Sequence, residues 1–289
     1  MVISLIVAGL ALGSIYALLG LSLVLVNKAT DVVNFAQGEI GMIGAFTGMT
    51  VLAASGWPLP LVFVVGMLSG ALLGLFLERV VIRPLGAAPH LNLLIVTVGL
   101  WFIFNSVAGL IWGYDPYRFP SLLPAEPLDI LGAKVPPSSL GIVAVACVSM
   151  ALLYLFFEHT RDGIAMRAAS NNPRAARLMG IRVERVAAIS WAVACGLSVT
   201  SSMLIAPVTF LDQQMMVPVI LKAFAGAILG GFTSLPGTVV GCVLLGLAET
   251  FVGAYLSAAL KDALAFTLII LVLMVKPAGL FGRSIRKKV

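Results

Sequence analysis

The chain has 289 residues, of which 61% are hydrophobic and 10% are charged, and its formal net charge is +6. A soluble domain carries roughly a quarter of its residues as charged side chains, so this composition excludes an ordinary soluble enzyme or binding module. The apolar runs are long enough to cross a ~30 Å hydrocarbon core, which takes about 20 helical residues, and they predict an all-α, polytopic helical membrane protein. A membrane β-barrel is excluded because its alternation of polar and apolar residues is absent.

The apolar runs predict one transmembrane domain over residues 1–289, with eight or nine transmembrane helices. The first run lacks a basic leading segment and is longer than the apolar core of a signal peptide, so we expect it to be retained as a span. Segment 217–232 is short, rich in glycine and followed by SLPG, so it is predicted either to cross the membrane or to be re-entrant. The expected spans are residues 3–26, 38–54, 59–78, 91–112, 139–157, 186–206, 217–232, 236–258 and 263–275.

A polar cluster lies at the start of the second expected span. It consists of Asn34, Gln37, Gly38 and Glu39, and glycines recur every three or four residues after it. Such glycines allow close helix packing, or a broken helix whose backbone lines a cavity. Polar groups inside a bilayer usually face a cavity or a partner, so the cluster is a candidate part of a transport pathway. The alternative is that Glu39 simply reaches solvent at the membrane edge.

The segment 113–138 contains six prolines. Repeated proline excludes a regular helix there. We expect an external loop, which either packs over the outer face as an ordered cap, contacts a soluble partner, or only connects two spans.

The polar segment 158–185 contains six arginines within an otherwise apolar chain. Thr160 is predicted to cap a first short helix, and Asp162 suits the positive end of its dipole. Asn171 and Asn172 interrupt that helix, Pro173 then begins a second one, and Gly180 ends it. The sequence therefore predicts two short helices between the fifth and sixth spans.

The first of these helices has alanines at positions 165, 168 and 169, which form one smooth face of small residues with arginines around it. Such a helix is suited to insert into a groove of a cytoplasmic partner. The alternative is an interfacial helix resting on lipid, but lipid anchors usually carry Trp, Phe or Leu on the buried face.

Two charged residues, Lys222 and Glu249, fall inside expected spans. A charge in the membrane is usually paired, so a structural ion pair is the first interpretation and a role in transport is the alternative. Whether the two side chains meet is left open by the sequence. Asn105, near the middle of the fourth span, is expected to form a hydrogen bond between helices.

The basic residues predict the orientation of the chain. With 158–185 in the cytoplasm, 14 of the 18 Lys and Arg lie in cytoplasmic segments and three lie in external ones. Because basic loops stay on the cytoplasmic side, the N-terminus is predicted outside and the C-terminus inside. The basic C-terminal tail RSIRKK is expected to bind anionic lipid rather than nucleic acid.

The stretch RDGIAMRAASNNPRAARLMGI resembles the cytoplasmic coupling loop of ABC importer permeases of the branched-chain amino acid family. The stretches DVVNFAQGEIGMIGAF and ILGGFTSLPGTVVGCVLLGLAE and the segment KPAGLFG resemble the LivH-type subunit of that family. The resemblance implies that the loop couples this chain to an ATPase. The residues expected to do so are Arg161, Asp162, Gly163, Ala165, Arg167, Ala168, Asn171, Asn172, Ala175 and Gly180.

The resemblance also implies a set of partners in the inner membrane of a bacterium. These are a sister permease subunit, two cytoplasmic ATPase subunits and an external substrate-binding protein, with the choice between a homodimer and a heterodimer of permeases left open. The chain has no G-x-x-x-x-G-K-[ST] phosphate loop, so it is expected to be no enzyme and to hold no cofactor, with ATP bound by the partner subunits. Its three cysteines lack metal-ligand spacing, so no metal site is expected.

The function that these features predict is a permease subunit of an ATP-driven importer for branched-chain, aliphatic amino acids, working by alternating access. Permeases of the same family for urea, amides or aromatic acids are the alternative substrates. A self-sufficient secondary transporter is an alternative of another class, but it would need several convergent intramembrane charges. An intramembrane enzyme is not expected, because both histidines, His90 and His159, lie at loop edges.

Overall fold

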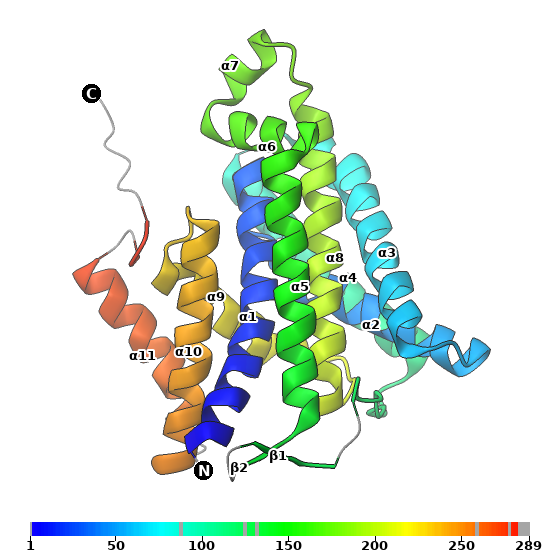
Figure 1. Ribbon diagram of the computed structural model, residues 1–289. Helices are drawn as coiled ribbons and strands as arrows, with labels where there is room; N and C mark the ends of the chain where they lie inside the picture. Colours follow the sequence, from blue (N-terminus) through cyan, green and yellow to red (C-terminus); the bar gives the residue numbers. More distant parts are fainter. Residues whose placement is uncertain are drawn as a thin grey trace. The chain divides into compact units, whose positions relative to one another are not determined.

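The computed structural model describes residues 2–86, 89–123, 126–130, 133–257, 260–276 and 279–282, and most of these residues are helical (Figure 1). The chain divides into two compact units. Met1–Val24, Ser121–Cys147 and Pro218–Val289 form the first, and Leu25–Pro120 with Val148–Val217 form the second. The divisions fall inside α1 (Val2–Thr30) and α5 (Pro137–His159) and near the start of α9 (Met216–Gly230), so these helices contribute to both units.

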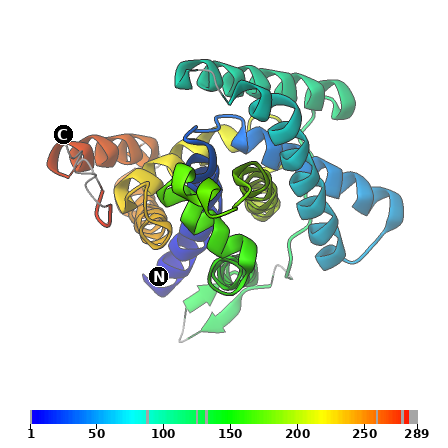
Figure 2. The same ribbon diagram turned by 90° about the horizontal axis from the view of Figure 1, so that it is seen from above.

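The second unit is built on α2 (Gln37–Ser55), α3 (Leu59–Leu77) and α8 (Val183–Thr209), which pack against one another (Figure 2). Glycines permit this close approach. A Cβ added at Gly66 would lie 2.8 Å from the Met203 sulfur, and one added at Gly74 would lie 2.6 Å from the Trp191 carbonyl oxygen. On α2, Gly41, Gly44 and Gly48 all face α8, so the prediction that the α2 glycines serve helix packing is confirmed.

The remaining elements of the second unit extend this core. The helix α3 continues into a π-helical turn, η1 (Glu78–Ile82), and a 3-10 turn, η2 (Arg83–Leu85). The helix α4 (His90–Trp112) runs beside α2. The short helices α6 (Arg161–Asn171) and α7 (Pro173–Leu178) follow α5 and precede α8.

The first unit combines the N-terminal part of α1 with α9, α10 (Leu235–Tyr255) and α11 (Leu260–Val275). An added Cβ at Gly13 of α1 would lie 2.7 Å from the Val243 Cα atom of α10, and one at Gly226 of α9 would lie 2.7 Å from the Cys242 Cα atom. Both added Cβ atoms would meet main-chain atoms of α10. The backbone of α10 therefore packs directly against the backbones of α1 and α9. The C-terminal segment caps the end of α9. The Leu280 and Phe281 amides donate hydrogen bonds to the carbonyls of residues 229 and 230, the last two of that helix.

Seven helices among the described residues are long and apolar enough to cross a membrane, and two apolar helices are shorter. The shorter two, Met216–Gly230 and Ala263–Val272, correspond to the expected seventh and ninth spans. The helix α9 has 15 residues and rises about 22 Å, less than the ~30 Å hydrocarbon core. Its length favours the re-entrant alternative. The seven long helices are Val2–Thr30, Gln37–Ser55, Leu59–Leu85, Leu91–Trp112, Pro137–His159, Val183–Thr209 and Leu235–Tyr255.

The proline-rich segment 113–138 is ordered where the structure describes it. Its first part belongs to the second unit, where Tyr117 pairs with Leu211 as an isolated β-bridge and the Phe119 ring packs against Phe63. Its second part belongs to the first unit and contains a hairpin of β1 (Leu128–Ile130) and β2 (Ala133–Val135). The hairpin was not predicted from the sequence, and the role of the segment as a cap, a partner contact or a connector stays a prediction.

Candidate functional site

The helix pair α6–α7 begins and ends as the sequence predicted. The Thr160 hydroxyl accepts a hydrogen bond from the Gly163 amide at 3.0 Å, and the Asn172 side-chain oxygen accepts one from the Ala175 amide at 3.0 Å. Each bond satisfies a free N–H of a first helical turn. Gly180 has a φ of 83°, a left-handed conformation that favours glycine after a helix end.

The face that α6 buries corrects the sequence prediction. Gly163, Met166 and Ala169 lie on one stripe that packs against Phe156 and Val186 of the same chain. Of the three alanines expected to meet a partner, Ala169 is buried, Ala165 is partly buried, and only Ala168 is exposed. Small side chains allow close packing either within the chain or against a partner. Here the end of α5 and the start of α8 cover the small-residue face of α6, so a partner does not contact it.

The exposed surface of the α6–α7 helix pair is apolar at the end of α7, and it is not the alanine face of α6 that the sequence predicted. Leu178 is 88% exposed and Met179 is 83% exposed, and both lie at the end of α7, while Ile164 is exposed on α6. Apolar side chains this exposed in a polar segment indicate an interaction surface. The sequence analysis missed Leu178 and Met179, although two large apolar residues just before the terminal Gly180 were a visible signal.

The polar groups of this segment include three ion pairs. Arg167 pairs with Glu158 at 2.7 Å, Arg177 with Glu184 at 3.2 Å, and Arg185 with Asp162 at 3.3 Å. All are exposed, so each contributes only about 0–1 kcal/mol. No ion pair within the described residues involves the other three arginines of the segment, Arg161, Arg174 and Arg182.

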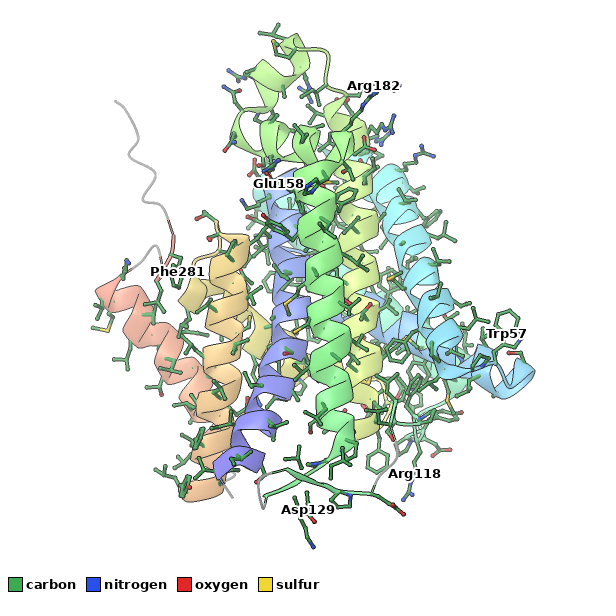
Figure 3. All side chains as sticks on the ribbon, in the orientation of Figure 1. Trp57, Arg118, Asp129, Glu158, Arg182 and Phe281 are labelled. Carbon is green, nitrogen blue, oxygen red and sulfur yellow. The ribbon has the colours of Figure 1, made fainter. Side chains whose placement is uncertain are left out.

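Arginines gather at one end of the second unit. Figure 3 places Glu158 and Arg182 at this end, and Trp57 and Arg118 at the opposite end. The end of α3 lies there too, because the Arg83 guanidinium donates to the Glu184 carbonyl at 3.2 Å. The unit therefore has a basic end and a nearly neutral one. The arginines at the basic end are Arg79, Arg83, Arg161, Arg167, Arg174, Arg177, Arg182 and Arg185.

The polar cluster at the start of α2 separates into two parts. Asn34 donates to the Gln37 side-chain oxygen at 2.8 Å and accepts from the Ala36 amide at 3.1 Å. The Gln37 carbonyl accepts from Ser198 of α8 at 2.5 Å, and Gly38 is buried beside it. Asn34 and Gln37 therefore fasten the entry of α2 to α8 and have their hydrogen bonds within the chain.

Glu39 faces another helix. The Trp101 indole N–H of α4 donates to its Oε1 atom at 2.5 Å, and the Asn105 side chain lies close to the same carboxyl group. Glu39 is only 2% exposed, so the alternative that it reaches solvent is wrong. Asn105 donates to the carbonyl of Gln213 at 3.0 Å, which ties α4 to the loop after α8, and its side chain also hydrogen-bonds Glu39 of α2, the expected contact between helices.

The two intramembrane charges meet. Lys222 Nζ lies 2.7 Å from Glu249 Oε1, and the Tyr16 hydroxyl donates to Glu249 Oε2 at 2.9 Å. Both charged side chains are largely buried within the first unit. The predicted ion pair is confirmed, and Tyr16 is a partner that the sequence did not reveal.

Comparison with known proteins gives consistent matches over nearly the whole chain. The family described as "Branched-chain amino acid transport system / permease component" matches residues 5–273. The high-affinity branched-chain amino acid transport system permease protein LivH of Escherichia coli K12 is 31% identical, over 97% of this chain and 96% of the relative. The corresponding protein BraD of Pseudomonas aeruginosa is 31% identical, over 98% of this chain and 96% of the relative.

One solved structure shares the fold. It is described as PsaBC from Streptococcus pneumoniae in complex with Fab, and it aligns with a TM-score of 0.50 at 14% identity. The alignment covers 95% of this chain and 91% of that chain. At this identity the similarity concerns the fold alone.

Proposed function

Because the chain belongs to the family of branched-chain amino acid transport system permeases, we propose that it is the permease subunit of an ATP-driven importer for branched-chain amino acids. ATP binding and hydrolysis take place in two separate cytoplasmic subunits. A second permease subunit, different from this one, completes the membrane part, and an external binding protein delivers the substrate. Transport proceeds by alternating access.

The α6–α7 helix pair is the observation that carries this proposal. It is a capped, polar helix pair that packs firmly on α5 and α8 and still exposes Leu178 and Met179. Because the two helices pack firmly on α5 and α8, a movement of the helix pair is transmitted to the spanning helices. The exposed Leu178 and Met179 side chains supply an apolar contact for the ATPase. Arg161, Arg174 and Arg182, which form no ion pair among the described residues, are available to acidic side chains of that partner.

The orientation follows from the charge difference between the two ends of the second unit. The end that carries α6 and α7 has eight arginines, whereas the opposite end has Arg118. Because basic segments stay in the cytoplasm, this difference supports a cytoplasmic position for the basic end. The N-terminus then lies outside and the chain is a multi-pass protein of the bacterial inner membrane. The tail expected to bind anionic lipid, residues 283–289, lies outside the described residues.

Uptake by the assembled importer tests the substrate. The chain, its sister permease, the ATPases and the binding protein are reconstituted in vesicles, and ATP-dependent uptake of labelled leucine, urea and benzoate is compared. We expect leucine to be taken up and the other two to be excluded. Uptake of urea or benzoate in place of leucine would reassign the substrate, and uptake by this chain alone without ATP would support a secondary transporter.

Co-purification tests the coupling surface. Leu178→Asp with Met179→Asp places two charges in the proposed apolar contact, so we expect at least a tenfold loss of bound ATPase, which corresponds to about 1.4 kcal/mol. The control is Trp57→Ser, which alters an exposed apolar side chain at the opposite end of the same unit. Normal ATPase binding by the double variant would contradict the coupling role.

A further inference from the structure

Three carboxylates are almost fully buried in the described chain: Glu39, Glu78 and Glu249. Burial of an ionised carboxylate is costly unless a cation and hydrogen bonds compensate it. Glu78 receives two bonds from the Arg83 guanidinium, at 3.2 and 2.8 Å. Glu249 is paired with Lys222 and bonded by Tyr16. Two of the three acids therefore have a cation from the chain itself.

Glu39 differs from both. Its Oε1 atom accepts from the Trp101 indole, while its Oε2 atom is buried and has no hydrogen-bond partner among the described residues. No described Lys, Arg or His lies within ion-pair distance of this carboxylate. An ionised Glu39 would need a cation from outside the described residues, because none of their basic side chains compensates a buried charge at this position.

The groups around Glu39 define which cation fits. Trp101 and Asn105 lie four residues apart on α4, so both project from one face of that helix. Asn105 donates its amide nitrogen to the Gln213 carbonyl, and its side chain also hydrogen-bonds the Glu39 carboxyl group. The bare carboxylate oxygen and the indole ring beside it match an alkylammonium group, which offers three N–H donors and binds aromatic faces. A metal ion such as Ca²⁺ takes six to eight oxygen ligands, more than this set provides.

We propose that Glu39 binds the α-ammonium group of the transported amino acid. This assignment rests on the proposed function, and it deepens it by giving the charged part of the substrate a fixed position between α2 and α4. Asn34 and Gln37 then act as structural supports, because their hydrogen bonds fix the α2 entry that carries Glu39. Since Glu39 is 2% exposed, the substrate reaches it only when α4 moves away from α2.

Direct binding separates this role from a structural one. The purified importer, without its binding protein, is equilibrated with labelled leucine and with labelled 2-hydroxy-4-methylpentanoate, which carries a hydroxyl in place of the ammonium. Glu39→Gln keeps the shape and the acceptor for Trp101 but removes the charge. We expect the Kd for leucine to rise at least tenfold and the Kd for the hydroxy acid to change less than twofold, with partial recovery of leucine binding in Glu39→Asp.

The matched control is Glu78→Gln, which removes another buried carboxylate from the same unit and should leave the ratio of the two Kd values unchanged. Equal weakening of both ligands by Glu39→Gln would overturn the proposal and assign Glu39 a structural role. Unchanged leucine binding with an altered pH dependence of uptake would also overturn it and indicate a bound proton. A wild-type importer that takes up urea or benzoate but not leucine overturns the proposed function itself.

Discussion

Replacing Glu249 with alanine tests whether the buried ion pair of the first unit stabilises the protein or takes part in transport. The Lys222 and Glu249 side chains are 13% and 5% exposed and lie 2.7 Å apart. Removing one partner leaves the other charge buried and costs about 3–5 kcal/mol. The same substitution removes the hydrogen bond that the Tyr16 hydroxyl donates to Glu249, which costs a further ~1 kcal/mol. We therefore expect Glu249→Ala to impair folding and assembly while substrate choice is unchanged.

Reversible unfolding of the purified subunit in mixed micelles measures this loss as a free energy. The informative comparison is the double variant Lys222→Met with Glu249→Leu, because an apolar pair of similar volume often replaces a buried ion pair at little cost. We expect the double variant to be more stable than Glu249→Ala by at least ~2 kcal/mol. A Glu249→Ala protein that is as stable as the wild type, or that assembles and accepts a different solute, would refute the structural interpretation.

Three further substitutions test the packing and the helix capping of the second unit. Gly163→Val introduces a Cβ that clashes with the backbone of α5, so we expect α6 to detach from α5. Protease cleavage at the arginines of α6 should then become faster. The control is Ala168→Val, at an exposed position of the same helix, which should be cleaved like the wild type. Gly74→Val should lower the free energy of unfolding by about 1–3 kcal/mol through overpacking. Its control is Gly99→Val, where an added Cβ meets no atom within 4 Å. An equal loss of stability in both variants would contradict the packing role of Gly74. Asn172→Ala should cost about 1 kcal/mol and fray α7, as seen by hydrogen exchange of its first amides; unchanged exchange would argue against the cap.

The caps and the helix order could be predicted from the sequence because they depend on neighbours in the chain. Thr160 and Asn172 bond to amides three residues away, and Gly180 takes its left-handed conformation at the helix end. The apolar runs likewise define the spanning helices through composition and length. The hairpin of β1 and β2 was missed because its strands have only three residues each, too few to produce a periodic pattern.

The roles of individual polar and small residues were decided by tertiary structure. Asn34, Gln37 and Glu39 lie within six residues of one another, yet Asn34 and Gln37 bond to each other while Glu39 bonds to Trp101 and keeps one bare carboxylate oxygen. Lys222 and Glu249 could be identified as unusual charges, but their meeting depends on how α9 and α10 cross. Sequence by itself determined which segments are helical and apolar, since local bonding and hydration depend on near neighbours. Only the folded chain decided which polar groups find partners, because those partners are brought together from residues far apart in the sequence.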